Sequence, residues 1–169
     1  FATAYAKKLN AEGVKFGITR IGIHSGEVIV GNFGGSTMFD YRALGDPVNT
    51  ASRLESVNKQ LGTNMCMSAA TLAGCADAAV RPVGRLVLKG KTEAIEVFEP
   101  LVAEREKRYA PRERYLDAYK QLSVAGGYEH AKVMFAELAV LYRDDPLVKL
   151  YSDRLERGEG GDLILMAEK

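Results

Sequence analysis

The stretch FDYRALGDPVNTASRLES, residues Phe39–Ser56, holds a Gly-Asp-Pro turn followed at once by residues of helical spacing. Asp46 is a suitable N-cap, and Pro47 suits the first helical position, where its missing N–H costs nothing. Apolar residues then recur at helical spacing and predict a buried stripe, made of Ala51, Leu54, Val57 and Leu61. The stretch therefore predicts a helix over 46–61 that starts at a tight turn and packs on one face.

A second face of this helix is polar. Asn49 and Arg53 are four residues apart, which makes them neighbours on a helix, and Ser56 and Gln60 continue the same side. The residues alone leave two interpretations open. The face is either an ordinary solvated surface or an amide and a guanidinium held side by side for a ligand.

Three features around the helix favour a ligand site. The turn GNFGG at 31–35 permits close approach of a ligand or partner chain to the backbone. The segment LKGK puts Lys89 and Lys91 around a glycine, as in a phosphate-contacting loop, and FDY at 39–41 adds a carboxylate and a phenol. Each also fits an ordinary loop or turn. The sequence contains no Walker loop, dinucleotide fingerprint, nucleophile elbow or zinc motif.

Helical and strand patterns alternate over the first hundred residues. The sequence predicts a helix over 1–13, a β-hairpin with strands at 17–24 and 27–32 around Ser25-Gly26, a strand in NMCMS, a small helix near 69–75 and a second hairpin turning at 90–92. Helices interleaved with antiparallel hairpins predict an α+β fold.

The composition changes near Ala103, where a charged, proline-interrupted segment begins. Three helices are expected after it, near 112–124, 127–142 and 146–157, and the terminal GDLILMAEK reads as a short strand or a tail. A faint tetratricopeptide-like pattern marks the middle helix. One such unit cannot bury its own apolar face, so we expect it to dock on the α+β part or on a partner.

Bulk composition bears on several classes of function. The chain has 169 residues and a net charge of +1, which gives no electrostatic footprint for nucleic acid. It contains no apolar run long enough to span a membrane. Cys66 and Cys75 lack metal-ligand spacing and favour a reduced, cytoplasmic compartment. We expect no nucleic-acid partner and no membrane contact from this segment, with tethering to the inner membrane through an upstream region left open.

Taken together, RIGIHSGEVIVGNFGG, GDPVNTASRLES and RPVGRLVLKGKTEAIEVFEPL strongly resemble the C-terminal half of a class III nucleotide cyclase catalytic domain, from about Phe1 to Leu101. The resemblance implies a partial ferredoxin-like α+β cyclase fold at 1–102 and a small all-α extension at 103–169, as in some bacterial members. Members of the family convert ATP or GTP to a 3′,5′-cyclic nucleotide and pyrophosphate. They work as head-to-tail dimers with the active site at the interface, which implies a homodimer here.

The resemblance also implies roles for single residues. Asn49 is similar to the amide that orients the ribose, and Arg53 to the guanidinium that stabilises charge on the α-phosphate. Lys89 is similar to the lysine that holds the polyphosphate, and the sequence does not separate it from Lys91. Arg42 stands where the family reads the purine edge. Arginine only donates, so it suits the guanine O6 or N7 edge, while stacking or pairing with a nearby carboxylate stays open.

The resemblance implies two Mg²⁺ or Mn²⁺ ions, held by two aspartates in the N-terminal half of the domain. Those motifs do not occur in this sequence, since Asp40 and Asp46 lie in other motifs and Asp46 is expected to cap its helix. We therefore expect an adenylate cyclase whose metal ligands lie upstream of Phe1, so that this chain is inactive alone. The alternatives are a guanylate cyclase and a degenerate, non-catalytic dimerisation or nucleotide-sensing module.

Overall fold

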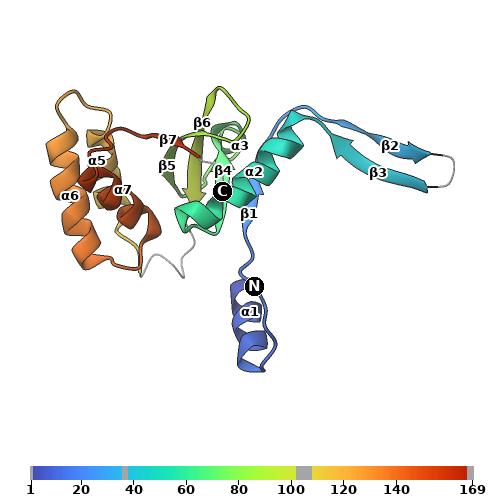
Figure 1. The fold of residues 1–169 in the computed structure, drawn as a ribbon, viewed down its shortest axis with the longest axis horizontal. Coiled ribbons are helices and arrows are strands. Elements are labelled where there is room, and N and C mark those ends of the chain that lie inside the picture. Colours follow the sequence, from blue (N-terminus) through green and yellow to red (C-terminus); the bar gives the residue numbers. More distant parts are fainter. Residues whose placement is uncertain (1, 36–37, 102–107, 167–169) are drawn as a thin grey trace.

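A computed structural model describes residues 2–35, 38–101 and 108–166 of the chain, and Figure 1 shows their arrangement. The elements follow in the order α1 (Ala2–Ala11), β1 (Ile21–Ile23), β2 (Ile29–Gly35), β3 (Met38–Leu44), α2 (Asp46–Leu61), β4 (Met65–Ser68), α3 (Ala69–Leu72), β5 (Val80–Val87), β6 (Ala94–Pro100), α5 (Arg112–Gln121), α6 (Tyr128–Leu141), α7 (Pro146–Glu156) and β7 (Leu163–Leu165). The first part of the charged segment expected after Ala103, residues 103–107, lies outside the described residues.

Five strands form one mixed sheet in the order β1-β4-β6-β5-β7, and β2 and β3 form a separate two-stranded ribbon. The outer strands β1 and β7 pair in parallel with their neighbours, while the inner pairs are antiparallel. The α+β class is thereby confirmed. So is the second predicted hairpin, since β5 and β6 pair antiparallel on either side of residues 88–93.

The first predicted hairpin is wrong. β1 pairs with β4, and β2 pairs with β3 in a register that sets Ile29 opposite Leu44. The β-branched run signals strands correctly, but the segment between them does not turn back. A Cβ placed on Gly26 would lie 2.5 Å from the Pro47 ring. The chain therefore runs close against the start of α2, and the partner of each strand is set by tertiary packing.

Helix α2 confirms the prediction drawn from the quoted stretch, with bounds Asp46–Leu61. Leu54, Val57 and Leu61 are buried in the core, as the apolar stripe predicts. β1 passes directly under the helix, because a Cβ on Gly22 would meet the carbonyl oxygen of Ala51 at 2.2 Å. On the polar face, Asn49, Ser56 and Gln60 are exposed and Arg53 is half-buried.

The helices α5, α6 and α7 pack beside the β5 side of the sheet (Figure 1). The terminal segment was expected to be a short strand or a tail, and residues Leu163–Leu165 form the strand β7, which extends the sheet by pairing with β5. Core residues of the helices, such as Tyr115, Phe135 and Tyr151, form one apolar cluster with residues of the strands. The boundary near residue 102 stays a prediction, and a tetratricopeptide-like unit is not shown.

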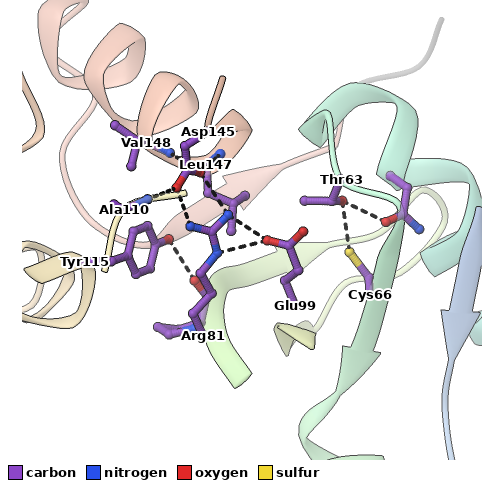
Figure 2. Close-up of polar contacts among 11 residues, drawn as sticks. Thr63, Cys66, Arg81, Glu99, Ala110, Tyr115, Asp145, Leu147 and Val148 are labelled. Atoms are coloured by element: carbon purple, nitrogen blue, oxygen red, sulfur yellow. Dashed lines mark hydrogen bonds and ion pairs between the residues drawn. The ribbon is translucent and has the colours of Figure 1, made fainter. Parts of the chain in front are cut away.

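A buried charge cluster joins the extension to the sheet. Arg81 on β5 is fully buried and donates to Glu99 on β6, and to Asp145 at 2.6 Å and 2.9 Å. Figure 2 shows the guanidinium between the two carboxylates. It also lies over the rings of Tyr109 and Tyr115, with 4.5 Å and 4.9 Å to their centroids.

Two elements project from this body. α1 and the β2–β3 ribbon extend away from the sheet (Figure 1). Large apolar side chains on and near them are exposed, namely Val14, Phe16, Ile18, Ile21, Val28, Ile29, Val30, Tyr41, Leu44 and Val48. Exposed apolar surface of this extent is typical of an interaction surface. Every helix in the described part of the chain is too short or too polar to cross a bilayer.

The two cysteines differ in burial. Cys66 is buried beside the Thr63 hydroxyl (Figure 2), and burial raises the pKa of its thiol to about 12, whereas Cys75 is exposed. Because the thiolate is the nucleophile, we expect Ellman's reagent at pH 8 to label Cys75 alone in the folded chain. Cys66 should react after denaturation in guanidinium. Rapid labelling of both thiols in the folded chain would contradict this packing.

Candidate functional site

The start of α2 differs from the prediction in one respect. Gly45 occupies the N-cap position with φ +149°, and no side chain caps the helix there. The carboxylate of Asp46 instead pairs with Lys91 and accepts a hydrogen bond from Thr50 at 3.4 Å. The expected capping role of Asp46 is therefore wrong, because the ammonium of Lys91 is available to the carboxylate as a partner of opposite charge.

Arg53 is held against the turn between β5 and β6. Its side chain is half-buried, and its Nη1 is buried without a hydrogen-bond partner in the described structure. A Cβ on Gly90 would lie 3.3 Å from that nitrogen, and Gly90 has φ +67°. A glycine is thus needed for the turn and for the close approach of the guanidinium. A buried donor with no partner is costly and favours an anionic ligand at this point.

An open pocket of about 540 Å³ lies beside Arg53. Four cationic side chains contribute to its wall, from Arg20, Arg53, Lys59 and Lys89, together with the single carboxylate of Glu55. The remaining lining residues are Ser56, Val57, Gln60, Gly90 and Met166. Arginine and lysine side chains around a pocket suit a polyphosphate, the arginines as planar forks and the lysines as point charges.

The structure separates the two lysines of LKGK. The turn closes by a hydrogen bond from the Lys91 N–H to the Leu88 carbonyl oxygen at 2.9 Å. Lys89 is exposed and lines the pocket, while the Lys91 ammonium turns to Asp46 at the start of α2. Of these two candidate phosphate ligands, only Lys89 lines the pocket together with Arg53.

Asn49 and Arg42 lie outside the residues that line the pocket. Asn49 is exposed on α2, one turn before Arg53. Arg42 is on β3 and pairs with Asp40 at 2.5 Å, which is one of the alternatives that the sequence left open. The structure therefore brings Arg53 and Lys89 together, but leaves the candidate ribose and purine residues on surface beyond the pocket.

Among the wall residues of the pocket, Ser56 and Gln60 were expected on the polar face of α2, while Arg20 and Met166 were not singled out from the sequence. Met166 had no usable signal, because its place beside Arg53 depends on the pairing of β7 with β5, where its N–H donates to Val87. Arg20 precedes a strand and gave no pattern by itself.

The described side chains do not fit a divalent metal site. Within 2–35, 38–101 and 108–166, no group of three or more His, Cys, Asp or Glu residues is arranged to hold an ion. Mg²⁺ prefers carboxylate oxygens and water, whereas the pocket wall is mostly cationic. No chemical step is therefore assigned to a metal held by these residues.

Comparison with known proteins gives consistent matches. The family described as "Adenylate and Guanylate cyclase catalytic domain" matches residues 3–99. Adenylate cyclase 1 of Rhizobium meliloti is 40% identical over 97 residues, which cover 57% of this chain and 15% of that protein. An adenylate cyclase of Anabaena cylindrica is 37% identical over 83 residues, covering 47% of this chain and 16% of that protein.

A solved structure, the adenylyl cyclase CyaB from P. aeruginosa, superposes with a TM-score of 0.52 and 29% identity. The superposition covers 61% of this chain and 53% of that one. The chain thus spans only about a sixth of these two curated relatives and about half of this solved structure.

Proposed function

Because this chain belongs to the adenylate and guanylate cyclase catalytic domain family, we propose that it is part of an adenylate cyclase that converts ATP to 3′,5′-cyclic AMP and pyrophosphate. One observation carries the proposal. The buried Nη1 of Arg53, which has no hydrogen-bond partner among the described residues, lies in the same pocket wall as Lys89, against the turn at Gly90. The adenylate cyclases to which the chain is similar support ATP over GTP.

The reaction asks mainly for positioning and charge stabilisation. The ribose 3′-oxygen bonds to the α-phosphorus, the bond to the pyrophosphate oxygen breaks, and the 3′-hydroxyl proton is released. In our proposal Arg53 stabilises the negative charge that builds up on the α-phosphate oxygens, and Lys89 holds the departing pyrophosphate. Preorganised cations in a pocket stabilise such charge without having to reorganise.

Catalytic domains of this class depend on divalent metal ions. Mg²⁺ or Mn²⁺, when bound, would lower the pKa of the attacking hydroxyl and neutralise phosphate charge. The pocket residues described here supply cations rather than a carboxylate cluster. We therefore propose that the two metal ions are held by other residues of the complete domain, and that residues 2–35, 38–101 and 108–166 supply no metal ligand.

Domains of this class bind nucleotide and work as dimers, and we propose a homodimer for this protein. The exposed apolar side chains near β1 and on the β2–β3 ribbon support this. A site shared between two protomers would also give roles to Asn49 and Arg42, which lie outside the pocket of one chain.

We further propose that the chain consists of a cyclase part at 1–102 and an extension at 103–169. We also propose a cytoplasmic location, in keeping with the two free cysteines.

The test is turnover of the complete catalytic domain, in which this chain is joined to the metal-binding half. Incubation with Mn²⁺ and ATP or GTP, followed by chromatography, should give cyclic AMP from ATP and little cyclic GMP from GTP. Residues 1–169 alone should give no product. Cyclic GMP as the main product would instead make Arg42 a guanine reader, since it can donate to O6 and N7. No product from either nucleotide would favour a non-catalytic module.

A further inference from the structure

One ion pair connects the two elements that carry Arg53 and Lys89. Asp46 is the first residue of α2, and Lys91 ends the turn that closes on Leu88. The Lys91 side chain is 28% exposed and the Asp46 side chain 65%. The hydrogen bond from Lys91 lowers the pKa of the Asp46 carboxyl, so the carboxylate is ionised at neutral pH.

The pair acts together with two further contacts along one helix face. Asp46, Thr50 and Arg53 follow at spacings of four and three residues, which places them in one row on α2. Asp46 reaches the end of the turn at Lys91, and the Arg53 guanidinium lies against its centre at Gly90. The helix thus contacts the turn at two consecutive residues, Gly90 and Lys91, and Lys89 comes directly before them in the chain.

Stability gives little reason for this arrangement. Ion pairs at exposed positions contribute little to folding, because water screens them and both side chains lose freedom. A phosphate-binding role for Lys91 is also poorly served, since the Asp46 carboxylate already neutralises the ammonium and would repel a nucleotide. Positioning of a catalytic group gives a stronger reason for the ion pair, because displacement of such a group by about 1 Å can lower the rate about 10²-fold.

We propose that Asp46 and Lys91 are positioning residues, whose ion pair fixes the 88–91 turn against α2 and so sets the place of Lys89 relative to Arg53. This inference rests on the proposed cyclase function. It separates the two lysines of LKGK by role. Lys89 meets the polyphosphate, and Lys91 holds the turn that presents it.

Activity of the complete catalytic domain tests the assignment. Asp46→Asn and Lys91→Gln should each lower kcat about 10- to 100-fold, with KM for Mn·ATP changed less than threefold. The charge-swapped double variant, Asp46→Lys with Lys91→Glu, should recover at least tenfold over its single variants. Lys149→Gln, which removes an exposed ion pair with Asp153 on α7, should leave both constants unchanged. If Lys91 bound phosphate directly, Lys91→Gln would instead raise the KM for Mn·ATP, and the charge-swapped double variant would recover no activity. That result would overturn the proposal.

A second readout does not depend on turnover. In amide hydrogen exchange followed by NMR, Asp46→Asn in the chain should speed exchange of the Lys91 N–H, which closes the turn. Amides in the middle of α2 should keep their rates. Unchanged exchange at Lys91 would overturn the positioning role even in an active enzyme. If the unmodified domain formed no cyclic nucleotide, the proposed function would be contradicted. The exchange measurement would still test whether the ion pair of Asp46 and Lys91 holds the turn.

Discussion

Replacing Arg53 by alanine in the complete catalytic domain is expected to lower kcat by about 10³- to 10⁵-fold, the range for an arginine aimed at a transferring phosphoryl group. The guanidinium lies in the pocket wall with Lys89, and its Nη1 has no hydrogen-bond partner in the described structure. This N–H donor is therefore available to bind the substrate. Removing an interaction made chiefly in the transition state lowers kcat and kcat/KM together.

The same substitution should hardly change folding. The Nη1 atom of Arg53 makes no hydrogen bond within the described structure, so its loss breaks no such bond there. The midpoint of thermal unfolding should therefore stay within a few degrees of that of the unmodified domain. Arg53→Lys should recover only part of the rate, because an ammonium keeps the charge and loses the planar fork. Arg114→Ala, at an exposed position on α5, is the matched control and should turn over normally. Turnover of Arg53→Ala at the unmodified rate would exclude the role proposed for Arg53.

Features were predictable from the sequence when the residues that determine them lie close together along the chain. Helix α2 was predictable to the residue, because its turn, its proline and its apolar spacing lie within one stretch. The ion pair of Asp46 with Lys91 was not, since the partners are 45 residues apart and each has a plausible local role. Asp46 was therefore expected to cap its helix, while it contacts a turn contributed by the next hairpin.

The strands show the same limit. The composition around Ser25-Gly26 indicates two strands, and both exist, but their partners are β4 and β3. Local pattern does not say which strand pairs with which. Similarly, the terminal segment was expected to be a strand or a tail, whereas the pairing of β7 with β5 and the resulting place of Met166 in the pocket wall needed the fold. The family resemblance predicted Arg53 and Lys89 as site residues, and the fold brings them together.

A second large effect is expected where the extension meets the sheet. Asp145 is fully buried and accepts hydrogen bonds from Arg81 and from the backbone N–H groups of Ala110, Leu147 and Val148. It thus caps α7 and pairs with a buried guanidinium (Figure 2). Asp145→Ala should lower the free energy of unfolding by about 3–5 kcal/mol, the usual cost of removing one partner from a buried ion pair.

Urea unfolding followed by circular dichroism measures this loss. Asp153→Ala, which removes a carboxylate from an exposed ion pair on α7, is the matched control and should cost less than about 1 kcal/mol. The double variant Arg81→Met with Asp145→Asn should be more stable than the sum of its single effects by about 0.5–3 kcal/mol, because residues of one charge network couple. A loss below 1 kcal/mol for Asp145→Ala would contradict the buried network.

The shape of that transition also bears on how the chain is divided. Arg81 and Glu99 belong to the sheet, and Asp145 to the extension, so the network spans the boundary proposed near residue 102. β7 adds a second link, because it lies in the sheet itself. A single cooperative transition that shifts as a whole in Asp145→Ala is expected from such shared packing. If the variant instead lost its helical signal first, while the amides of β4, β5 and β6 stayed protected, the extension would be an independent unit.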